Sequence, residues 1–161
     1  MLYLTNTHQR MDNNKVLITG VAGFIGSNLL DFLLAKTDWD IDGVDNLSTG
    51  SEDNIKHVNS SRFNFISNDA FEITSLKPYS KVYHLAALPR IQPSFELIND
   101  HIKANVLLAG HLIELMIKES HFPRFVYSGS SAIYGTPDQI PTPETEKVDC
   151  LSPYAFQKYE V

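Results

Sequence analysis

The chain has 161 residues, of which 43% are hydrophobic and 20% are charged, and its formal net charge at pH 7 is −6. This mixture is typical of a soluble globular domain with its own core. The negative charge argues against nucleic acid as a partner, because a nucleic-acid-binding surface needs clustered lysine and arginine. A small phosphate-bearing ligand is still allowed, since backbone amides bind phosphate without net charge.

Cysteine content and hydropathy narrow the class further. Cys150 is the only cysteine, which excludes an intramolecular disulfide and a cysteine-based metal site, and no metal site is expected. No apolar run approaches the ~20 residues that span a bilayer, so no membrane partner is expected. Residues 1–14 contain too short an apolar stretch for a secretory signal and are interpreted as a polar extension. A cytoplasmic, reducing location fits these features.

Short apolar runs alternate with helical patterns in the rest of the chain. Strands are predicted over 15–20, 40–46, 63–67, 81–87 and 124–130, and helices over 24–36 and 101–119. Such alternation predicts an α/β fold with a doubly wound parallel sheet. Residues 136–153 are rich in threonine, serine and proline and are predicted to form a loop.

The first predicted strand runs directly into the glycine turn TGVAGFIG, which places Gly20, Gly23 and Gly26 before the first helix. Glycines at such a place permit a tight turn and let the backbone approach a pyrophosphate, while the helix N-terminus adds free amides. The spacing is G-x-x-G-x-x-G rather than the commoner G-x-G-x-x-G. An ordinary tight turn between strand and helix is the alternative.

The ends of the next three predicted strands fit a dinucleotide at the same edge. Asp45 ends the second strand about 20 residues past the glycines, where a carboxylate can bond the adenosine ribose and would repel a 2′-phosphate, so NAD is favoured over NADP. Asp69, after the third strand, is a candidate acceptor for the adenine amino group. The alternatives are a turn-forming Asp45 and a helix-capping Asp69. The fourth strand ends with residues that let a cofactor lie against the backbone: Leu85, Ala86 and Ala87. His84 before them is interpreted as a buried structural histidine.

A serine-rich stretch, SGSSAIYG, follows the fifth predicted strand, and Tyr154 and Lys158 follow at the start of a helix in SPYAFQK. The carboxyl ends of parallel strands share one edge, so the serines lie on the edge of the glycine turn. A free phenol is a poor base, and lowering its pKa by ~3 units requires ~4 kcal/mol of preferential stabilisation of the phenolate. A lysine one turn away and an oxidised nicotinamide can supply it, and a serine hydroxyl can bond the reacting oxygen. Two exposed helix residues are the alternative.

These stretches, together with DNLSTG and HLAALPRIQPS, resemble the extended short-chain dehydrogenase/reductase family and, within it, the NAD-dependent nucleotide-sugar epimerase/dehydratase group. The resemblance implies a Rossmann fold, with Tyr154 as general base, Lys158 as its partner that also holds the nicotinamide ribose, and Ser130 as the catalytic hydroxyl. Ser131 would lie beside the sugar, and Asn105 matches a structural asparagine. The implied cofactor contacts are Gly20, Gly23, Phe24, Ile25 and Gly26 for the pyrophosphate, Asp45 and Asn46 for the ribose, and Asp69 for adenine.

The residues after Ser130 indicate the reaction. The resemblance implies that dehydratases and decarboxylases carry an acid just after the catalytic hydroxyl residue, whereas this chain has Ser131 and Ala132 there. This favours a UDP-hexose or UDP-N-acetylhexosamine 4-epimerase, in which hydride passes transiently from sugar C4 to NAD. The alternatives are a related dehydratase or reductase, and an NAD-binding fragment or half of a split enzyme without turnover of its own.

Members of this family are longer than this chain. We therefore expect residues 15–161 to form an incomplete NAD-binding domain, truncated after the fifth strand and the start of the following helix, without a C-terminal substrate domain. The fifth strand is expected to be an open edge, and the isolated chain to be inactive. Self-association, as a homodimer or otherwise, is expected through an apolar stripe on the long helix: Leu108, Leu112, Leu115 and Met116. The alternative is that these four are core residues.

Overall fold

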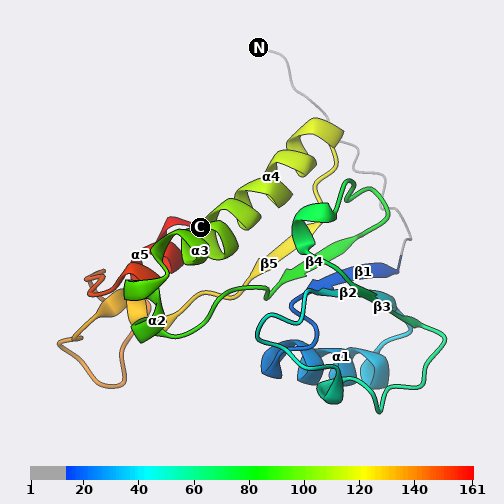
Figure 1. Cartoon of the computed structure of the whole chain (residues 1–161), viewed down its shortest axis with the longest axis horizontal. Coiled ribbons are helices and arrows are strands. Elements are labelled where there is room, and N and C mark those ends of the chain that lie inside the picture. Colours follow the sequence, from blue (N-terminus) through cyan, green and yellow to red (C-terminus); the bar gives the residue numbers. More distant parts are fainter. Residues whose placement is uncertain (1–13) are drawn as a thin grey trace.

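A computed structural model describes residues 14–161 and contains the predicted alternation of strands and helices (Figure 1). The strands are β1 (Lys15–Thr19), β2 (Asp40–Asp45), β3 (Phe63–Ser67), β4 (Lys81–His84) and β5 (Arg124–Tyr127). The helices are α1 (Phe24–Lys36), α2 (Ile91–Glu96), α3 (Ile98–Ile102), α4 (Leu108–Glu119) and α5 (Pro153–Glu160). The polar extension predicted over 1–14 lies outside the described residues, apart from Asn14.

The five strands form one parallel sheet in the order β3-β2-β1-β4-β5. The chain moves outward from β1 first in one direction and then in the other, so the predicted doubly wound fold is confirmed. The reversal between β1 and β4 creates a crevice at the carboxyl edge of the sheet, which is where open α/β sheets bind ligands. In the described part of the chain β5 pairs with β4 alone, so the predicted open edge is present.

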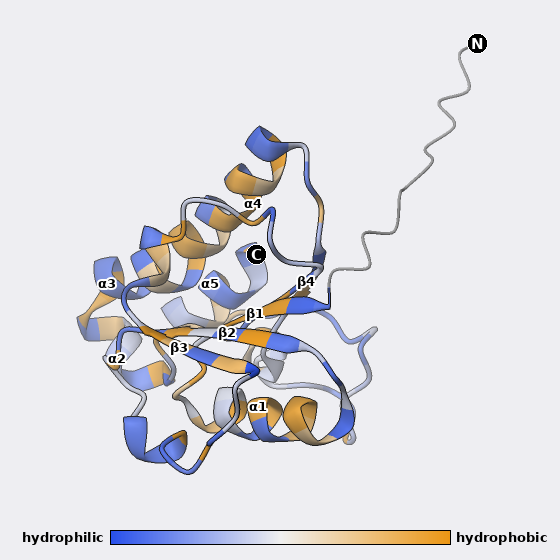
Figure 2. Cartoon of the chain, turned by 90° about the vertical axis from the view of Figure 1, so that its right-hand side faces the viewer, coloured by the Kyte–Doolittle hydropathy of each residue, from blue (hydrophilic) through white to orange (hydrophobic). Residues whose placement is uncertain are grey.

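Helices cover both faces of the sheet, α1 on one side and α4 with α5 on the other (Figures 1 and 2). Val16 and Ile18 of β1 belong to a buried cluster with Leu30 of α1. Leu17, which lies between them, belongs to the opposite cluster with Leu112 of α4. Both faces of β1 are therefore buried, which explains why its sequence is a continuous apolar run rather than an alternating one.

The long helix differs from its prediction in extent and in its exposed face. It was predicted over 101–119, but helical structure begins at Ile98, and a π-helical segment, Lys103–Leu107, separates α3 from α4. The predicted apolar stripe is wrong: Leu108 and Leu112 are buried against the sheet, and the other two members pack against the same cluster. Self-association stays a prediction without this support.

The fourth and fifth strands end earlier than predicted, at His84 and Tyr127 rather than at residues 87 and 130. The ladder stops there because β1 ends at Thr19, which pairs with His84, and the chain then turns away at Gly20. The residues beyond these ends are therefore free to line the crevice. None of the helices in the described part of the chain combines the length and apolar character that crossing a bilayer requires.

Candidate active site

A cavity of about 980 Å³ opens at the carboxyl edge of the sheet, between the ends of β1, β2 and β4 and the helices α2 to α5. Its lining includes all the predicted cofactor-binding residues: Gly20, Gly23, Phe24, Ile25, Gly26, Asp45, Asn46, Asp69, Leu85, Ala86, Ala87, Tyr154 and Lys158. These residues are spread over most of the chain, and the doubly wound sheet brings them around one space. The volume is suited to a ligand much larger than a single phosphate or sugar.

Ser130 and Ser131 are the predicted site residues that do not line this cavity. Ser130 precedes a short 3-10 turn, where its hydroxyl oxygen accepts a 3.2 Å hydrogen bond from the amide of Ala132. Because this bond uses only an acceptor position, the hydroxyl proton remains available to another group. The neighbouring Ser128 and Gly129 do line the cavity. The roles of Ser130 and Ser131 therefore stay predictions.

The glycine turn has the close contacts that a pyrophosphate loop requires. Gly20 has φ of 75°, and a Cβ atom there would lie 2.7 Å from the amide nitrogen of Ala86. A Cβ at Gly26 would overlap the carbonyl oxygen of Gly20, so helix α1 can approach the turn only without a side chain. Gly23 precedes α1 without a side-chain cap, which leaves amides of the first turn available to a ligand at the positive end of the helix.

Asp45 ties this turn to the second strand. Its Oδ2 accepts a 2.9 Å hydrogen bond from the amide of Ala22, and its Oδ1 accepts one of 2.8 Å from the amide of Leu47. The side chain is 9% exposed and lies on the cavity wall. A carboxylate has about four acceptor positions, so both oxygens can accept ribose hydroxyls as well. A ribose contact, which stays a prediction, is compatible with the structural role.

Asp69 caps a 3-10 turn, as the alternative interpretation of this residue predicts. Its Oδ1 accepts a 3.0 Å hydrogen bond from the amide of Phe71, while its Oδ2 faces the side-chain nitrogen of Asn46 at 3.4 Å. The cap does not remove Asp69 from the cavity, because the residue remains on the lining next to Asn46 and Phe71. The adenine contact predicted for Asp69 is therefore sterically compatible with the cap and stays a prediction.

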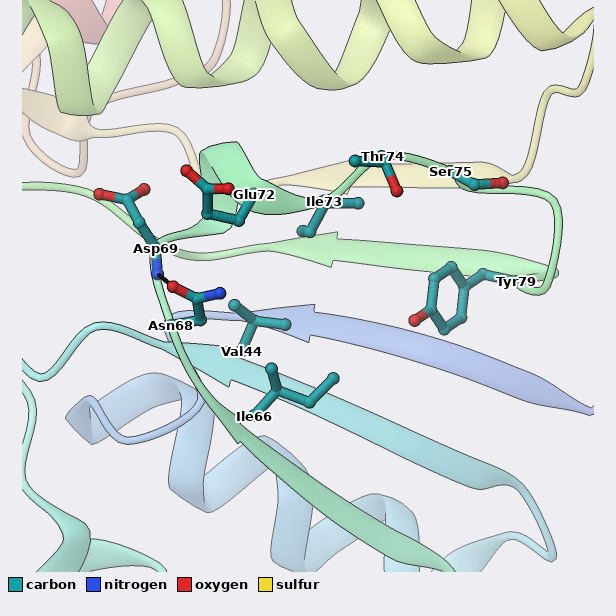
Figure 3. Close-up of a pocket in the computed structure, with 9 residues that line it drawn as sticks. All are labelled: Val44, Ile66, Asn68, Asp69, Glu72, Ile73, Thr74, Ser75 and Tyr79. Carbon is teal, nitrogen blue, oxygen red and sulfur yellow. Dashed lines mark hydrogen bonds between the residues drawn. The ribbon is translucent and has the colours of Figure 1, made fainter.

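A smaller pocket of about 230 Å³ adjoins this end of the cavity and shares Val44 and Asp69 with it (Figure 3). It lies beside the ends of β2 and β3 and the connection to β4, and its lining is completed by Ile66, Asn68, Glu72, Ile73, Thr74, Ser75 and Tyr79. The carboxylates of Asp69 and Glu72 lie at the same end (Figure 3). Two acids disfavour the binding of an anion in the smaller pocket. The glycine turn therefore remains the predicted site for a pyrophosphate.

Helix α5 is positioned at its first turn by two serines. Ser152 caps the helix, its hydroxyl accepting a 3.1 Å hydrogen bond from the amide of Ala155. Ser94 of α2 accepts a second 3.1 Å bond from the amide of Tyr154. Ser94 is fully buried, so this contact fixes the backbone of Tyr154 against α2. The helix α2 was not predicted, and it is what holds the candidate base in place.

The π-helical segment before α4 supplies a second clamp on α5. Asn105 lies in this segment and is buried. Its side chain bonds both backbone groups of Leu88, at 2.8 and 3.1 Å, and donates a 3.0 Å bond to the Oε1 atom of Gln157. Asn105 thus connects Leu88, which follows β4, to Gln157, which precedes Lys158 in α5. The predicted structural character of Asn105 agrees with these contacts, and π-helical turns are frequent at functional sites.

Lys158 is 7% exposed and lies on the cavity wall, one helical turn after Tyr154. Burial lowers its pKa to about 8. The amine is therefore mainly protonated at pH 7. The arrangement of the tyrosine and the lysine on one wall is what proton abstraction from a bound alcohol needs.

Several lining residues were not predicted, among them His101, Arg90 and Lys103. Arg90 has φ of 83°, an uncommon backbone conformation for a residue other than glycine, and strained residues of this kind cluster at functional sites. Arg90 and Lys103 could have been identified from their charge, because they are the only arginine and lysine between residues 84 and 110. Within residues 14–161 no three histidine, cysteine, aspartate or glutamate side chains are grouped as metal ligands would be.

Comparison with known proteins places the chain in a family. Residues 16–161 match the NAD dependent epimerase/dehydratase family. A putative UDP-glucose 4-epimerase of Methanocaldococcus jannaschii is 33% identical over 148 residues, which cover 89% of this chain and 47% of that protein. UDP-glucuronic acid decarboxylase 4 of Arabidopsis thaliana is 37% identical over 134 residues, which cover 81% of this chain and 29% of that protein. The chain spans about half the length of these relatives, or less.

Solved structures give the same result. The UDP-N-acetylglucosamine 4-epimerase of Methanobrevibacter ruminantium is 30% identical with a TM-score of 0.81, over 92% of this chain and 48% of that one. The UDP-glucuronic acid 4-epimerase of Bacillus cereus, solved with UDP-glucuronic acid and NAD, is 29% identical with a TM-score of 0.82, over 91% of this chain and 49% of that one. The predicted Rossmann fold and the predicted family resemblance are both confirmed.

The contact between Gly26 and Gly20 leads to a stability prediction. Gly26→Ala should lower the free energy of unfolding by about 1–3 kcal/mol, because the new methyl group overlaps the Gly20 carbonyl and forces the turn and α1 apart. Gly110→Ala is the matched control, since a Cβ at Gly110 in α4 meets nothing within 4 Å. It should raise stability by about 0.5–1 kcal/mol. Urea denaturation measures both, and equal effects of the two substitutions would contradict the packing argument.

Proposed function

Because the chain belongs to the NAD dependent epimerase/dehydratase family, we propose that it binds NAD in the large cavity and provides the proton-transfer residues of a UDP-sugar 4-epimerase. The observation that supports this most strongly is that the glycine turn, Asp45 and the Tyr154–Lys158 pair line one cavity. A tight turn alone would explain the glycines, and a helix face alone would explain the tyrosine and lysine. Neither explains why they meet.

The residues around the cavity fit a dinucleotide. The missing Cβ atoms of Gly20 and Gly26 let the turn pack closely against Ala86 and the start of α1, and the first-turn amides of α1 suit the pyrophosphate. Asp45 and Asn46 would hold the adenosine ribose, and Asp69 would accept from adenine. The small residues after β4 would let the nicotinamide half lie against the backbone on its way to Lys158.

Bound NAD would supply an acceptor that takes a hydride from sugar C4 and gives it back. In this proposal Tyr154 takes the proton of the 4-hydroxyl as the hydride leaves, and it returns a proton to the same oxygen when the ketone is reduced on its other face. The Lys158 ammonium would favour the phenolate and would hold the nicotinamide ribose. Ser130 donates its hydroxyl proton to the sugar oxygen, which its capping bond leaves possible.

Two observations bear on the kind of reaction. The relatives include 4-epimerases, UDP-glucuronic acid decarboxylases and an NDP-hexosamine 5,6-dehydratase. Ser131 and Ala132 follow Ser130 in this chain, so an acid is missing where elimination or decarboxylation would use one. This supports epimerisation. A second candidate, NAD binding without turnover, is favoured by the span of the chain, which is about half that of the epimerase relatives.

Calorimetric titration with NAD and with NADP tests the cofactor proposal. NAD should bind with a dissociation constant on the order of micromolar, and NADP at least ~10-fold more weakly, because the Asp45 carboxylate repels a 2′-phosphate. Asp45→Ser should reduce that preference, whereas Asp53→Ser, which removes an exposed acid outside the cavity, should not. Equal affinity for both dinucleotides in a folded wild-type chain would contradict the assignment of Asp45.

A chimera tests the reaction. Residues 15–161 joined to the remaining half of the Methanobrevibacter ruminantium epimerase should invert UDP-N-acetylglucosamine at C4. Tyr154→Phe should lower the rate by at least ~100-fold, because the general base is lost, while Tyr159→Phe alters an exposed ring on the same helix and should not. The isolated chain should bind NAD without turnover.

Product analysis by NMR separates the outcomes of this experiment. Inversion at C4 that survives Tyr154→Phe would contradict the role of Tyr154. An inactive chimera that still binds NAD and UDP-sugar would contradict the epimerase proposal and favour the binding-only alternative.

A further inference from the structure

Three side chains form a row across the carboxyl ends of β1, β4 and β5. Thr19 pairs in register with His84, and His84 pairs with Tyr127. The Oγ1 atom of Thr19 lies 2.8 Å from Nδ1 of His84, and the His84 and Tyr127 rings stack with centroids 5.8 Å apart at 30°. Register partners on neighbouring strands point to the same face of a sheet. The strand ladder, not a loop, therefore sets the position of the Tyr127 ring.

Lys158 stands over the end of this row. Its Nζ atom lies 4.2 Å from the centroid of the Tyr127 ring. The amine is almost buried, and among the described residues it forms no ion pair. A buried ammonium needs compensation, and an aromatic face at this distance provides it.

Two titratable groups of the sheet near the amine, His84 and Tyr127, bring no charge at neutral pH. Burial, followed by the Lys158 charge, lowers the pKa of His84 on β4 to about 4, so its imidazole is neutral. Burial raises the pKa of Tyr127 on β5 to about 12, so its phenol is neutral. Tyr154 lies on α5 itself. Within residues 14–161 the Tyr127 hydroxyl and the His84 Nε2 atom have no hydrogen-bond partner. Because Lys158 Nζ lies over the ring centroid, the ring face, rather than the hydroxyl, is the part of Tyr127 that meets the lysine.

We propose that Tyr127 is a positioning residue for Lys158: its ring face holds the lysine ammonium on the cavity wall, and Thr19 and His84 fix that ring from the sheet. The consequence for catalysis rests on the proposed function, in which Lys158 serves Tyr154. The positioning itself concerns only the described residues of this chain. Tyr127 touches neither substrate nor cofactor in this account and acts through the lysine.

The protonation midpoint of Lys158 reports on this contact directly. It can be followed by NMR of the chain labelled with ¹³C-lysine, with the Lys158 signal identified by its absence in Lys158→Arg. The ring face stabilises the charged form, so its removal should lower the midpoint. We expect Tyr127→Leu and Tyr127→Met to lower it by about one pH unit relative to wild type. Tyr127→Phe keeps the face and should leave the midpoint within a few tenths of a unit. Tyr159→Leu makes the same exchange at an exposed ring on α5 and should leave it unchanged.

Two non-aromatic variants are used so that the test still stands if one of them fails to fold. Met and Leu differ in length and shape, so they fill the position of the Tyr127 ring differently. A midpoint that stays at the wild-type value in the folded Leu or Met variant would overturn the proposal. So would a fall in Tyr127→Phe as large as that in Tyr127→Leu, because the hydroxyl and not the face would then be responsible. Titration of the same samples with NAD tests the proposed function separately: a chain that fails to bind NAD but shows the predicted midpoints would refute the cofactor proposal alone.

Discussion

The carboxylate of Asp45 joins the glycine turn to the second strand, and the cavity depends on that junction. It accepts hydrogen bonds from the amides of Ala22 in the turn and Leu47 beyond β2. Bonds to an ionised acceptor are stronger than neutral ones, so the turn is held where Gly20 can contact the β4 exit at Ala86. Asp45, for which the sequence predicts a cofactor-selecting role, is thus part of the scaffold, and the proposed ribose contact would use acceptor positions that these two bonds leave free.

The opposite wall of the cavity is assembled from contacts between segments far apart in the chain. Ser94, Asn105 and Tyr127 come from α2, the π-helical segment and β5, and each fixes a different point of α5. The first holds the backbone of Tyr154, and the last faces the amine of Lys158. A helix of eight residues has little stability of its own. These tertiary contacts are therefore what place the tyrosine and the lysine toward the cavity.

Much of the candidate site could be predicted because its signals are local. Each signal involves only a few residues: the glycine spacing, an acid at the end of the second strand, and a tyrosine and lysine one helical turn apart. The shared edge of a parallel sheet then brings them together. Ser130 shows the limit of this reasoning, because a hydroxyl can cap a turn or face a ligand, and the sequence does not tell which. Its hydroxyl caps a turn, and the cavity is lined by Ser128 and Gly129 instead.

The remainder could not be predicted because it depends on which surfaces meet. The spacing of Leu108 and Leu112 predicts an apolar helix face, but the same face suits a core or an interface, and here the sheet covers it. Asn105 in the π-helical segment bonds Leu88 and Gln157, which lie seventeen residues before it and fifty-two after it, so these contacts could not be read from local sequence. The row formed by Thr19, His84 and Tyr127 likewise could not be predicted, because it depends on the order β1-β4-β5 in the sheet.

Hydrogen–deuterium exchange with and without NAD tests the central claim most directly, namely that one cavity joins the glycine turn to helix α5. If NAD spans the cavity, its addition should slow exchange of the amides at the start of α1 and also of those in α5, around Tyr154 and Lys158. Both regions should saturate at the same NAD concentration. Slowed exchange at the turn alone, with α5 unchanged at saturating NAD, would contradict the claim and would separate the cofactor site from the proposed catalytic pair.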